Sequence, residues 1–110
     1  MNHSPDIGTL TEFLVNIKFV DTSGKLTADE EVALVAEERS RAAELKAQGL
    51  LVRMWRVPGR DENWGLWRAE NPTHLHQILT SLPYWPYMDL QVYCLADHPV
   101  DPIRPSGPTG

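Results

Sequence analysis

The chain has 110 residues, 42% hydrophobic and 23% charged, which is the composition of a single globular domain. Its formal net charge of −5 argues against nucleic acid as a partner, because phosphates need a basic surface. One cysteine excludes an internal disulfide and a thiolate zinc cluster, and neither a secretion signal nor an apolar run of about 20 residues is present. We therefore expect a cytoplasmic protein that binds no membrane.

The pattern of apolar residues predicts four strands and two helices in the order βαββαβ. The first helix is expected to open with Thr27 and Glu30 in a capping box and to end before Gly49. The second is expected to begin with Asn71 as N-cap and Pro72 as its first residue. Runs rich in β-branched and aromatic residues predict strands at 13–20, 50–57, 63–69 and 88–95.

This order is that of an α+β, ferredoxin-like fold, in which both helices cover one face of the sheet. Trp55, Trp64, Trp67, Met54 and Tyr93 are spread over both faces of the predicted strands, so a second copy or a ligand should cover the other face. The expected organisation is an N-terminal extension over 1–12, the domain over 13–96 and a Pro/Gly-rich tail over 97–110.

The first helix carries two charged residues within its predicted apolar arc. On a helical wheel Arg39 falls near the middle of the arc, and Glu38 falls between Val35 and Leu45. One interpretation is a snorkelling arginine whose stem covers core atoms while its head reaches water. The other is a pocket between helix and sheet, in which Glu38 moves a proton and Arg39 binds an anion. The arc itself consists of Val32, Val35, Ala36, Ala42 and Ala43, with Leu34 and Leu45 at one edge.

The remaining ionisable residues give weaker signals. Arg53 and Arg56 alternate onto opposite faces of their strand, and Arg53 shares a face with Trp55, on which it can stack. His76 flanks the apolar stripe of the second helix, a position typical of a hydrogen-bonded boundary residue. His74 and His76 do not share a helix face, and no metal or nucleotide motif occurs, so we expect neither metal nor cofactor.

The segment from Leu75 to Pro99 resembles the muconolactone delta-isomerase family, including its chloromuconolactone dehalogenase-like relatives. That family has the pattern LHxxLxxLPxxPYMDxEVxxLxxHP, and PYMD with both flanks is a specific match. Weaker similarities lie upstream, where the family has D-E-K, W-R and G-x-x-x-N. The matching residues are Leu75-His76, Leu79, Leu82-Pro83, Pro86-Tyr87-Met88-Asp89, Val92, Leu95 and His98-Pro99, with Glu37-Glu38-Arg39, Trp55-Arg56, Gly59 and Asn63 upstream.

The resemblance implies a dimeric α+β barrel, with the homodimer assembling into a decamer, and a place in aromatic catabolism. It also implies cofactor-free isomerisation of an unsaturated lactone, in which a proton moves between carbons. Glu38 is the candidate proton carrier, because burial raises a carboxyl pKa toward the working pH, and Arg39 is the candidate anchor for a carboxylate or enolate. The candidate substrate-binding residues are Arg53, Asn63, His76, Tyr87 and Asp89.

Four departures from the family pattern bear on the substrate. Arg53 replaces a histidine, which removes one titratable proton carrier and argues against muconolactone itself. The expected substrate is still an acidic or carbonyl-bearing small molecule. Arg39 replaces a lysine, Gln91 a glutamate and Trp64 a tyrosine. Two other functions remain open on such a fold: a non-catalytic barrel that binds small ligands, and a cofactor-free oxygenase or cyclase.

Two proline-rich stretches complete the sequence. Pro83 and Pro86 fix the backbone between the second helix and the last strand, so the aromatic residues around them should fill a pocket edge or a subunit seam. The tail has Val100 and Ile103 as apolar anchors between prolines, which favours an extended strap across a neighbouring subunit.

Overall fold

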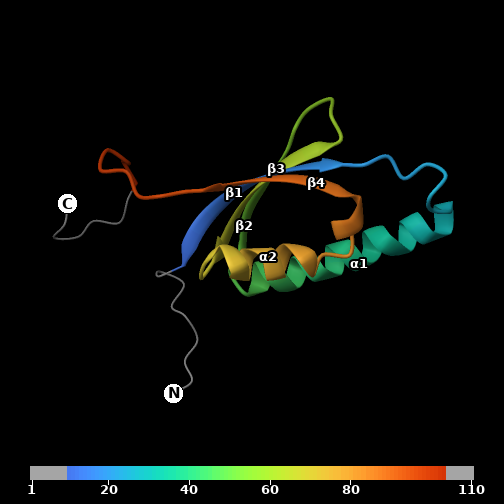
Figure 1. The fold of residues 1–110 in the computed structure, drawn as a ribbon, viewed down its shortest axis with the longest axis horizontal. Coiled ribbons are helices and arrows are strands. Elements are labelled where there is room, and N and C mark those ends of the chain that lie inside the picture. The colour runs from blue at the N-terminus through green and yellow to red at the C-terminus, as the bar shows by residue number, and fades with distance from the viewer. Residues whose placement is uncertain (1–9, 104–110) are drawn as a thin grey trace, which may run out of the picture.

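A computed structural model describes residues 10–103 and confirms the predicted order of strands and helices (Figure 1). Each strand lies within two residues of its predicted bounds, and the largest difference is the start of the first strand at Thr11 rather than Phe13. A short 3₁₀ turn before the last strand is the one addition. The elements are β1 (Thr11–Phe19), α1 (Ala28–Ala47), β2 (Leu51–Arg56), β3 (Glu62–Ala69), α2 (Pro72–Thr80), η2 (Trp85–Tyr87) and β4 (Met88–Cys94).

The four strands form one antiparallel sheet in the order β2-β3-β1-β4, and both helices lie on the same face of it (Figure 1). At the centre, Val15 of β1 lies opposite Gly65 of β3 and Val92 of β4. This is the ferredoxin-like α+β fold that the sequence predicts.

Local capping signals place the helix ends where the sequence predicts them. The Thr27 hydroxyl accepts from the N–H of Glu30 at 3.1 Å, and the Thr27 N–H donates to the Glu30 carboxylate at 2.8 Å. After α1, Gly49 adopts a φ of 77°, the left-handed conformation that ends a helix. The Asn71 side chain accepts from the N–H of His74 at 2.8 Å and so caps α2.

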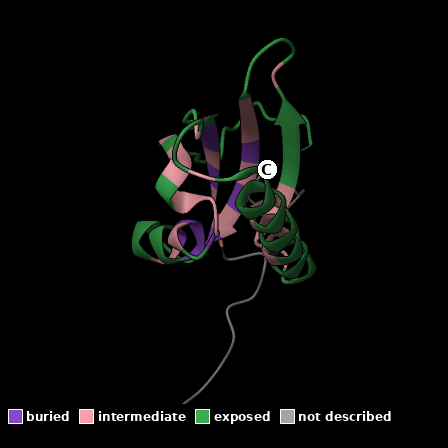
Figure 2. Ribbon diagram, turned by 90° about the vertical axis from the view of Figure 1, so that its right-hand side faces the viewer, coloured by how far each residue is buried: buried purple, intermediate pink, exposed green. Residues whose placement is uncertain are grey.

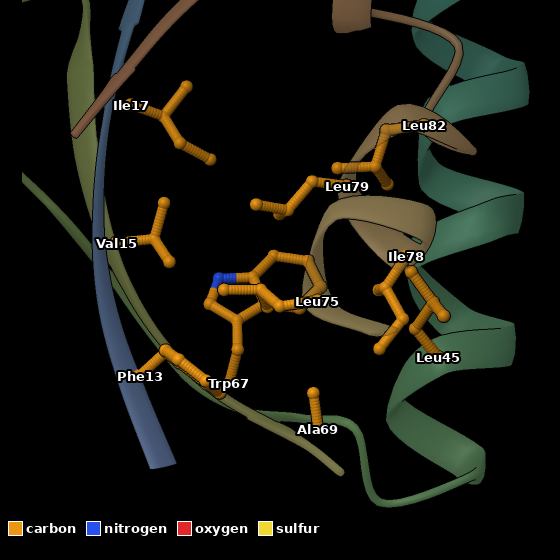
Figure 3. Packing of buried hydrophobic residues seen from close by; sticks show 10 residues of the cluster. All are labelled: Phe13, Val15, Ile17, Leu45, Trp67, Ala69, Leu75, Ile78, Leu79 and Leu82. Atoms are coloured by element: carbon orange, nitrogen blue, oxygen red, sulfur yellow. The ribbon is translucent and has the colours of Figure 1, made fainter. Parts of the chain in front are cut away.

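The core lies between the helix-facing side of the sheet and the two helices, and Trp67 is the largest side chain in it (Figure 3). Its indole lies between Val15 of β1 and Leu75 of α2. Gly65 makes room for this ring, because a Cβ at that position would come within 2.5 Å of the Trp67 Nε1 and 2.7 Å of the Met54 Sδ. The buried core residues are Phe13, Val15, Ile17, Leu45, Trp67, Ala69, Leu75, Ile78, Leu79 and Leu82.

The inward face of α1 is rotated relative to the predicted arc. Val32, which lies within the predicted arc, is 70% exposed, and Arg39 is exposed as well, so the predicted position of Arg39 in the middle of the inward face is wrong. Leu45 is buried, and Leu34 and Glu38 are half-buried. Figure 2 shows α1 largely exposed, with buried residues in the central strands and α2. The alanines of α1 bury too little area to set its orientation, so the two leucines set it instead.

The face of the sheet away from the helices is partly apolar, as predicted. Trp55 and Tyr93 on this outer face are 42% and 48% exposed, and the Tyr93 ring lies 6.0 Å from that of Trp64. The guanidinium of Arg53 lies 4.8 Å above the Trp55 ring, which confirms the predicted stacking. We call the set Arg53, Trp55, Trp64, Leu66 and Tyr93 the outer-face patch.

Beyond β4 the chain leaves the sheet and projects from the domain (Figure 1). Val100 and Ile103 are 76% and 88% exposed there. The predicted extended conformation is wrong for the described part of this tail, because turns form at 99–100 and 102–103 and the Asp101 N–H donates to the His98 carbonyl at 3.0 Å. Positions 104–110 lie outside the described residues.

Candidate functional site

A cavity of about 380 Å³ opens between α1, the end of β1 and the connector that precedes β4. This volume is within the range of small-molecule sites, roughly 300–1,000 Å³. The cavity lies on the helix side of the sheet, where the sequence predicts a pocket. Its lining consists of Phe19, Val20, Asp21, Thr22, Ser23, Glu31, Val35, Glu38, Arg39, Asp61 and Tyr84.

Glu38 lies on the inward face of α1 and lines this cavity. Its Oε1 accepts a hydrogen bond from the backbone N–H of Tyr84 at 2.9 Å. Burial raises the pKa of the Glu38 carboxyl above its usual value of 4.5, and the hydrogen bond from Tyr84 offsets part of the rise. A carboxylate with a raised pKa is a stronger base than an exposed glutamate, which suits it to accept a proton and release it again.

Arg39 lines the same cavity from its exposed rim. Among residues 10–103 its guanidinium forms no ion pair and no hydrogen bond, so it is free to bind an anion. The predicted pair is therefore present at one cavity, but its two members differ in depth: Glu38 is half-buried and Arg39 reaches water.

The lining is acidic apart from Arg39. Asp21, Glu31 and Asp61 join Glu38, which gives four carboxyl groups against one guanidinium. Hydrogen bonds from Ser23 lower the pKa of the Asp21 carboxyl, and one of them runs from the Ser23 backbone N–H to the Asp21 Oδ1 at 2.9 Å. The cavity thus disfavours a ligand that carries several negative charges.

Tyr84 is the aromatic side chain of the connector that reaches the cavity. Its ring packs edge to face against Phe19, with centroids 5.7 Å apart, and against Tyr87 at 6.3 Å. Burial, and then the carboxylates of Glu31, Glu38 and Asp61, raise the pKa of the Tyr84 phenol above its usual value of 10. The phenol therefore stays protonated and able to donate a hydrogen bond. Its proline-rich, aromatic surroundings indicated a pocket edge, and no local signal singled Tyr84 out.

Asn63 does not line the cavity itself; it lies opposite Ile17 on the helix-facing side of β3, two positions after the cavity-lining Asp61. Its Oδ1 is buried without a hydrogen-bond partner in the described part of the chain. Arg56 of β2 lies opposite Asn63. No signal in the sequence marks Arg56 as a site residue. An unpaired buried acceptor next to an arginine is suited to bind a polar ligand group.

The other predicted binding residues lie away from the cavity. Arg53 belongs to the outer-face patch, and His76 is exposed on α2 with its ring 5.7 Å from that of Trp85. Asp89 is exposed on the outer face opposite Lys18 of β1. Tyr87 packs against Tyr84 but does not line the cavity itself. Of the predicted site residues, the cavity thus brings together Glu38 and Arg39, whereas Asn63, Arg53, His76, Tyr87 and Asp89 do not line it.

No helix between residues 10 and 103 is long and apolar enough to cross a bilayer. In the same range, no three His, Cys, Asp or Glu side chains are arranged so that they could hold a metal ion.

Comparisons with known proteins agree on one family. The family profile described as muconolactone delta-isomerase matches residues 11–101. The chain is 33% identical over 79 residues to muconolactone delta-isomerase 2 of Acinetobacter lwoffii, covering 72% of this chain and 82% of that one. It is 38% identical over 66 residues to the enzyme of Pseudomonas aeruginosa, covering 60% and 69%. A crystal structure of muconolactone isomerase superposes with a TM-score of 0.76 at 27% identity, covering 86% of this chain and 97% of that one.

Proposed function

The chain belongs to the muconolactone delta-isomerase family and is an isomerase of that type, and from this premise we propose that it shifts a double bond within an unsaturated lactone by proton transfer. The observation that supports this most strongly is that the Glu38 carboxyl lines a cavity, is half-buried and has a raised pKa. Proton transfer between carbons requires a positioned base whose pKa is matched to its task.

The proposed reaction uses the Glu38 carboxylate twice. It first removes a proton from a saturated carbon adjacent to the double bond that is conjugated with the lactone carbonyl, and the electron pair of the broken C–H bond delocalises onto the carbonyl oxygen as an enolate. Glu38 then returns the proton to a different carbon of the conjugated system, which re-forms the carbonyl with the double bond in its new position. Atoms and electrons balance within the substrate and one carboxyl group, so the proposed reaction needs no cofactor.

The depth difference between Glu38 and Arg39 orients the substrate in this proposal. The lactone ring enters toward Glu38, and a carboxylate on the substrate stays at the rim, where Arg39 binds it. The four carboxyl groups of the lining favour a ligand with a single negative charge over one with more. Asn63 and Arg56 are the proposed contacts for a further polar group of the substrate.

We propose that the enzyme is a homodimer formed through the outer-face patch and that dimers assemble further into a decamer. The support is the exposure of Trp55 and Tyr93 on a sheet face that no helix within residues 10–103 covers. Val100 and Ile103 are the proposed anchors of the strap on a neighbouring subunit. A cytoplasmic location completes the proposal, because the exposed free thiol of Cys94 suits a reducing compartment.

Incubation of the enzyme with a panel of butenolides in D₂O, followed by NMR, tests the proposed function. Deuterium entering a ring carbon, together with migration of the double bond, is the expected result. Tight binding without exchange would instead indicate a ligand-binding protein, and consumption of oxygen would indicate an oxygenase. Either of these outcomes would overturn the isomerase mechanism.

A further inference from the structure

Tyr84 contacts the proposed base through its backbone and reaches the same cavity with its side chain. Its N–H donates to the Glu38 carboxylate at 2.9 Å, while its ring lines the cavity and is held edge-on by Phe19. In residues 10–103 the Tyr84 hydroxyl takes part in no hydrogen bond. The same residue thus positions a base and presents an uncommitted neutral donor beside it.

The other hydroxyl groups of the cavity are already engaged. The Thr22 hydroxyl lies 3.5 Å from the Glu31 carboxylate and donates to it. The Ser23 backbone N–H donates to the Asp21 carboxylate at 2.9 Å, and the Ser23 side chain also lowers the pKa of that carboxyl, so it interacts with Asp21. Of the hydroxyl groups in the lining, the Tyr84 phenol is therefore the one that no carboxylate engages.

We propose that Tyr84 is a catalytic residue that donates a hydrogen bond to the carbonyl oxygen of the substrate, an inference that rests on the proposed isomerase function. When Glu38 removes the carbon-bound proton, negative charge develops on this oxygen, and the phenol stabilises it without giving up its own proton. Donors aimed at a developing oxyanion are among the largest contributors to enzymatic rates.

A neutral donor suits this cavity better than a second acid would. With four carboxyl groups in the lining, an additional negative charge on the substrate is electrostatically disfavoured, and Arg39 is committed at the rim. Burial, together with the carboxylates of Glu31, Glu38 and Asp61, raises the pKa of the phenol above its usual value of 10, so the donor is present at neutral pH. Tyr84 and Glu38 thus divide the work: one stabilises the oxygen and the other moves the proton.

Tyr84→Phe tests this inference because it removes only the hydroxyl and keeps both the ring and the backbone N–H that binds Glu38. We expect kcat for the lactone to fall by roughly 10²–10³-fold, with little change in KM. The acid limb of the pH profile, which Glu38 sets, should stay in place, whereas a merely structural effect on Glu38 would move it. Tyr93→Phe, which removes a phenol on the opposite face of the sheet, is the matched control and should retain wild-type kcat.

Binding of tetronic acid, a butenolide whose enolate is stable at neutral pH, provides a readout that does not depend on turnover. We expect its Kd to rise roughly 10–100-fold in Tyr84→Phe and to stay unchanged in Tyr93→Phe. Wild-type rates and unchanged tetronic acid affinity in Tyr84→Phe would overturn the inference and leave the isomerase function intact. A wild-type enzyme that isomerises no lactone would overturn the proposed function, and the tetronic acid comparison would still decide whether the phenol binds an enolate oxygen.

Discussion

The carboxylate of Glu38 on α1 accepts a hydrogen bond from the backbone N–H of Tyr84, which lies 46 positions further along the chain. This contact joins the first helix to the connector before β4, and both residues line the cavity. The hydrogen bond holds the carboxylate, while burial raises its pKa. The fold therefore places a positioned base of raised pKa in a small-molecule cavity.

Glu38→Gln should stabilise the folded protein at neutral pH. The carboxyl pKa is higher in the folded state than in the unfolded chain, so ionisation of Glu38 favours unfolding, and stability is lost as pH rises through the folded pKa. Glutamine removes this charge and keeps an oxygen that can accept from the Tyr84 N–H. We expect a higher Tm for the variant at pH 7, a difference that disappears below the usual carboxyl pKa of 4.5.

The exposed neighbour Glu37 provides the matched control, because Glu37→Gln removes the same charge from a side chain that is not buried. Thermal melts of both variants from pH 3 to pH 8 separate the two effects. A Glu38→Gln variant that melts below both wild type and Glu37→Gln at pH 7 would contradict the assignment of a desolvated carboxyl.

Arg39→Ala should weaken the binding of a lactone that carries a carboxylate. Loss of a charge-assisted hydrogen bond raises KM by roughly 10–100-fold, while kcat changes less because the reacting carbons are not contacted. A lactone without the carboxylate serves as the control substrate, and its KM should be the same for both enzymes. Equal losses on the two substrates would show that Arg39 does not bind the carboxylate.

Gly65→Ala should destabilise the fold by roughly 1–3 kcal/mol, because the added methyl group overlaps the Trp67 indole and the Met54 thioether. Chemical denaturation measures the cost. In a Trp67→Phe background the position of the Trp67 Nε1 is vacant, so the same glycine substitution should cost less there. An equal cost in both backgrounds would show that the indole is not what fixes glycine at this position.

Much of the fold is predictable because local residues determine it. The start of α1 is set within one turn by the hydrogen bonds between Thr27 and Glu30. The start of α2 is set in the same way by the Asn71 cap and by the proline that follows it. The orientation of α1 is different, since it depends on which side chains gain most by packing on the sheet. An arc dominated by alanines indicates the inward direction of the helix poorly. For that reason the helical wheel predicts Arg39 in the middle of the inward face, whereas the structure has it exposed.

The separation of Arg53 from the cavity also has a physical cause. Leu51 lies opposite Trp67, but Arg53 lies opposite Leu66, because the register of β2 shifts between Leu51 and Arg53. Without the shift, Arg53 would share the helix-facing side with Leu51. Alternation predicts that Arg53 and Arg56 lie on opposite faces of the sheet. The register shift between Leu51 and Arg53 determines that Arg56 is the one on the helix-facing side.

Tyr84 illustrates the same limit at longer range. Its neighbours Pro83 and Pro86 indicate a rigid corner, which the structure has as the connector and η2. Its contact with Glu38 depends on how α1 packs beside that corner, and nothing within a few residues of either one specifies it. Contacts of this kind follow from the tertiary fold and not from local sequence.

Trp55→Glu should dissociate the proposed dimer, because it puts a charge in the outer-face patch where two apolar surfaces would meet. Light scattering is expected to give the mass of a monomer for the variant and that of a dimer or larger assembly for the wild type. Val32→Glu adds the same charge at an exposed valine on α1 and is the control. A folded, monodisperse wild-type monomer would contradict the proposed assembly.

Removal of the chain after Ala96 tests the proposed role of the strap separately. If Val100 and Ile103 anchor on a neighbouring subunit, the shortened protein should form smaller assemblies or bind the lactone more weakly. Light scattering and a binding titration on the same sample measure both. Unchanged size together with unchanged affinity would show that the strap seals neither a seam nor a pocket.

The most direct test of Glu38 as the proton carrier is the rate of deuterium incorporation from D₂O into an accepted lactone, followed by NMR, for wild type, Glu38→Gln and Glu37→Gln. The mechanism predicts a loss of roughly 10²–10⁴-fold for Glu38→Gln, with the fold intact, and a wild-type rate for Glu37→Gln. Exchange at the wild-type rate in Glu38→Gln would contradict it.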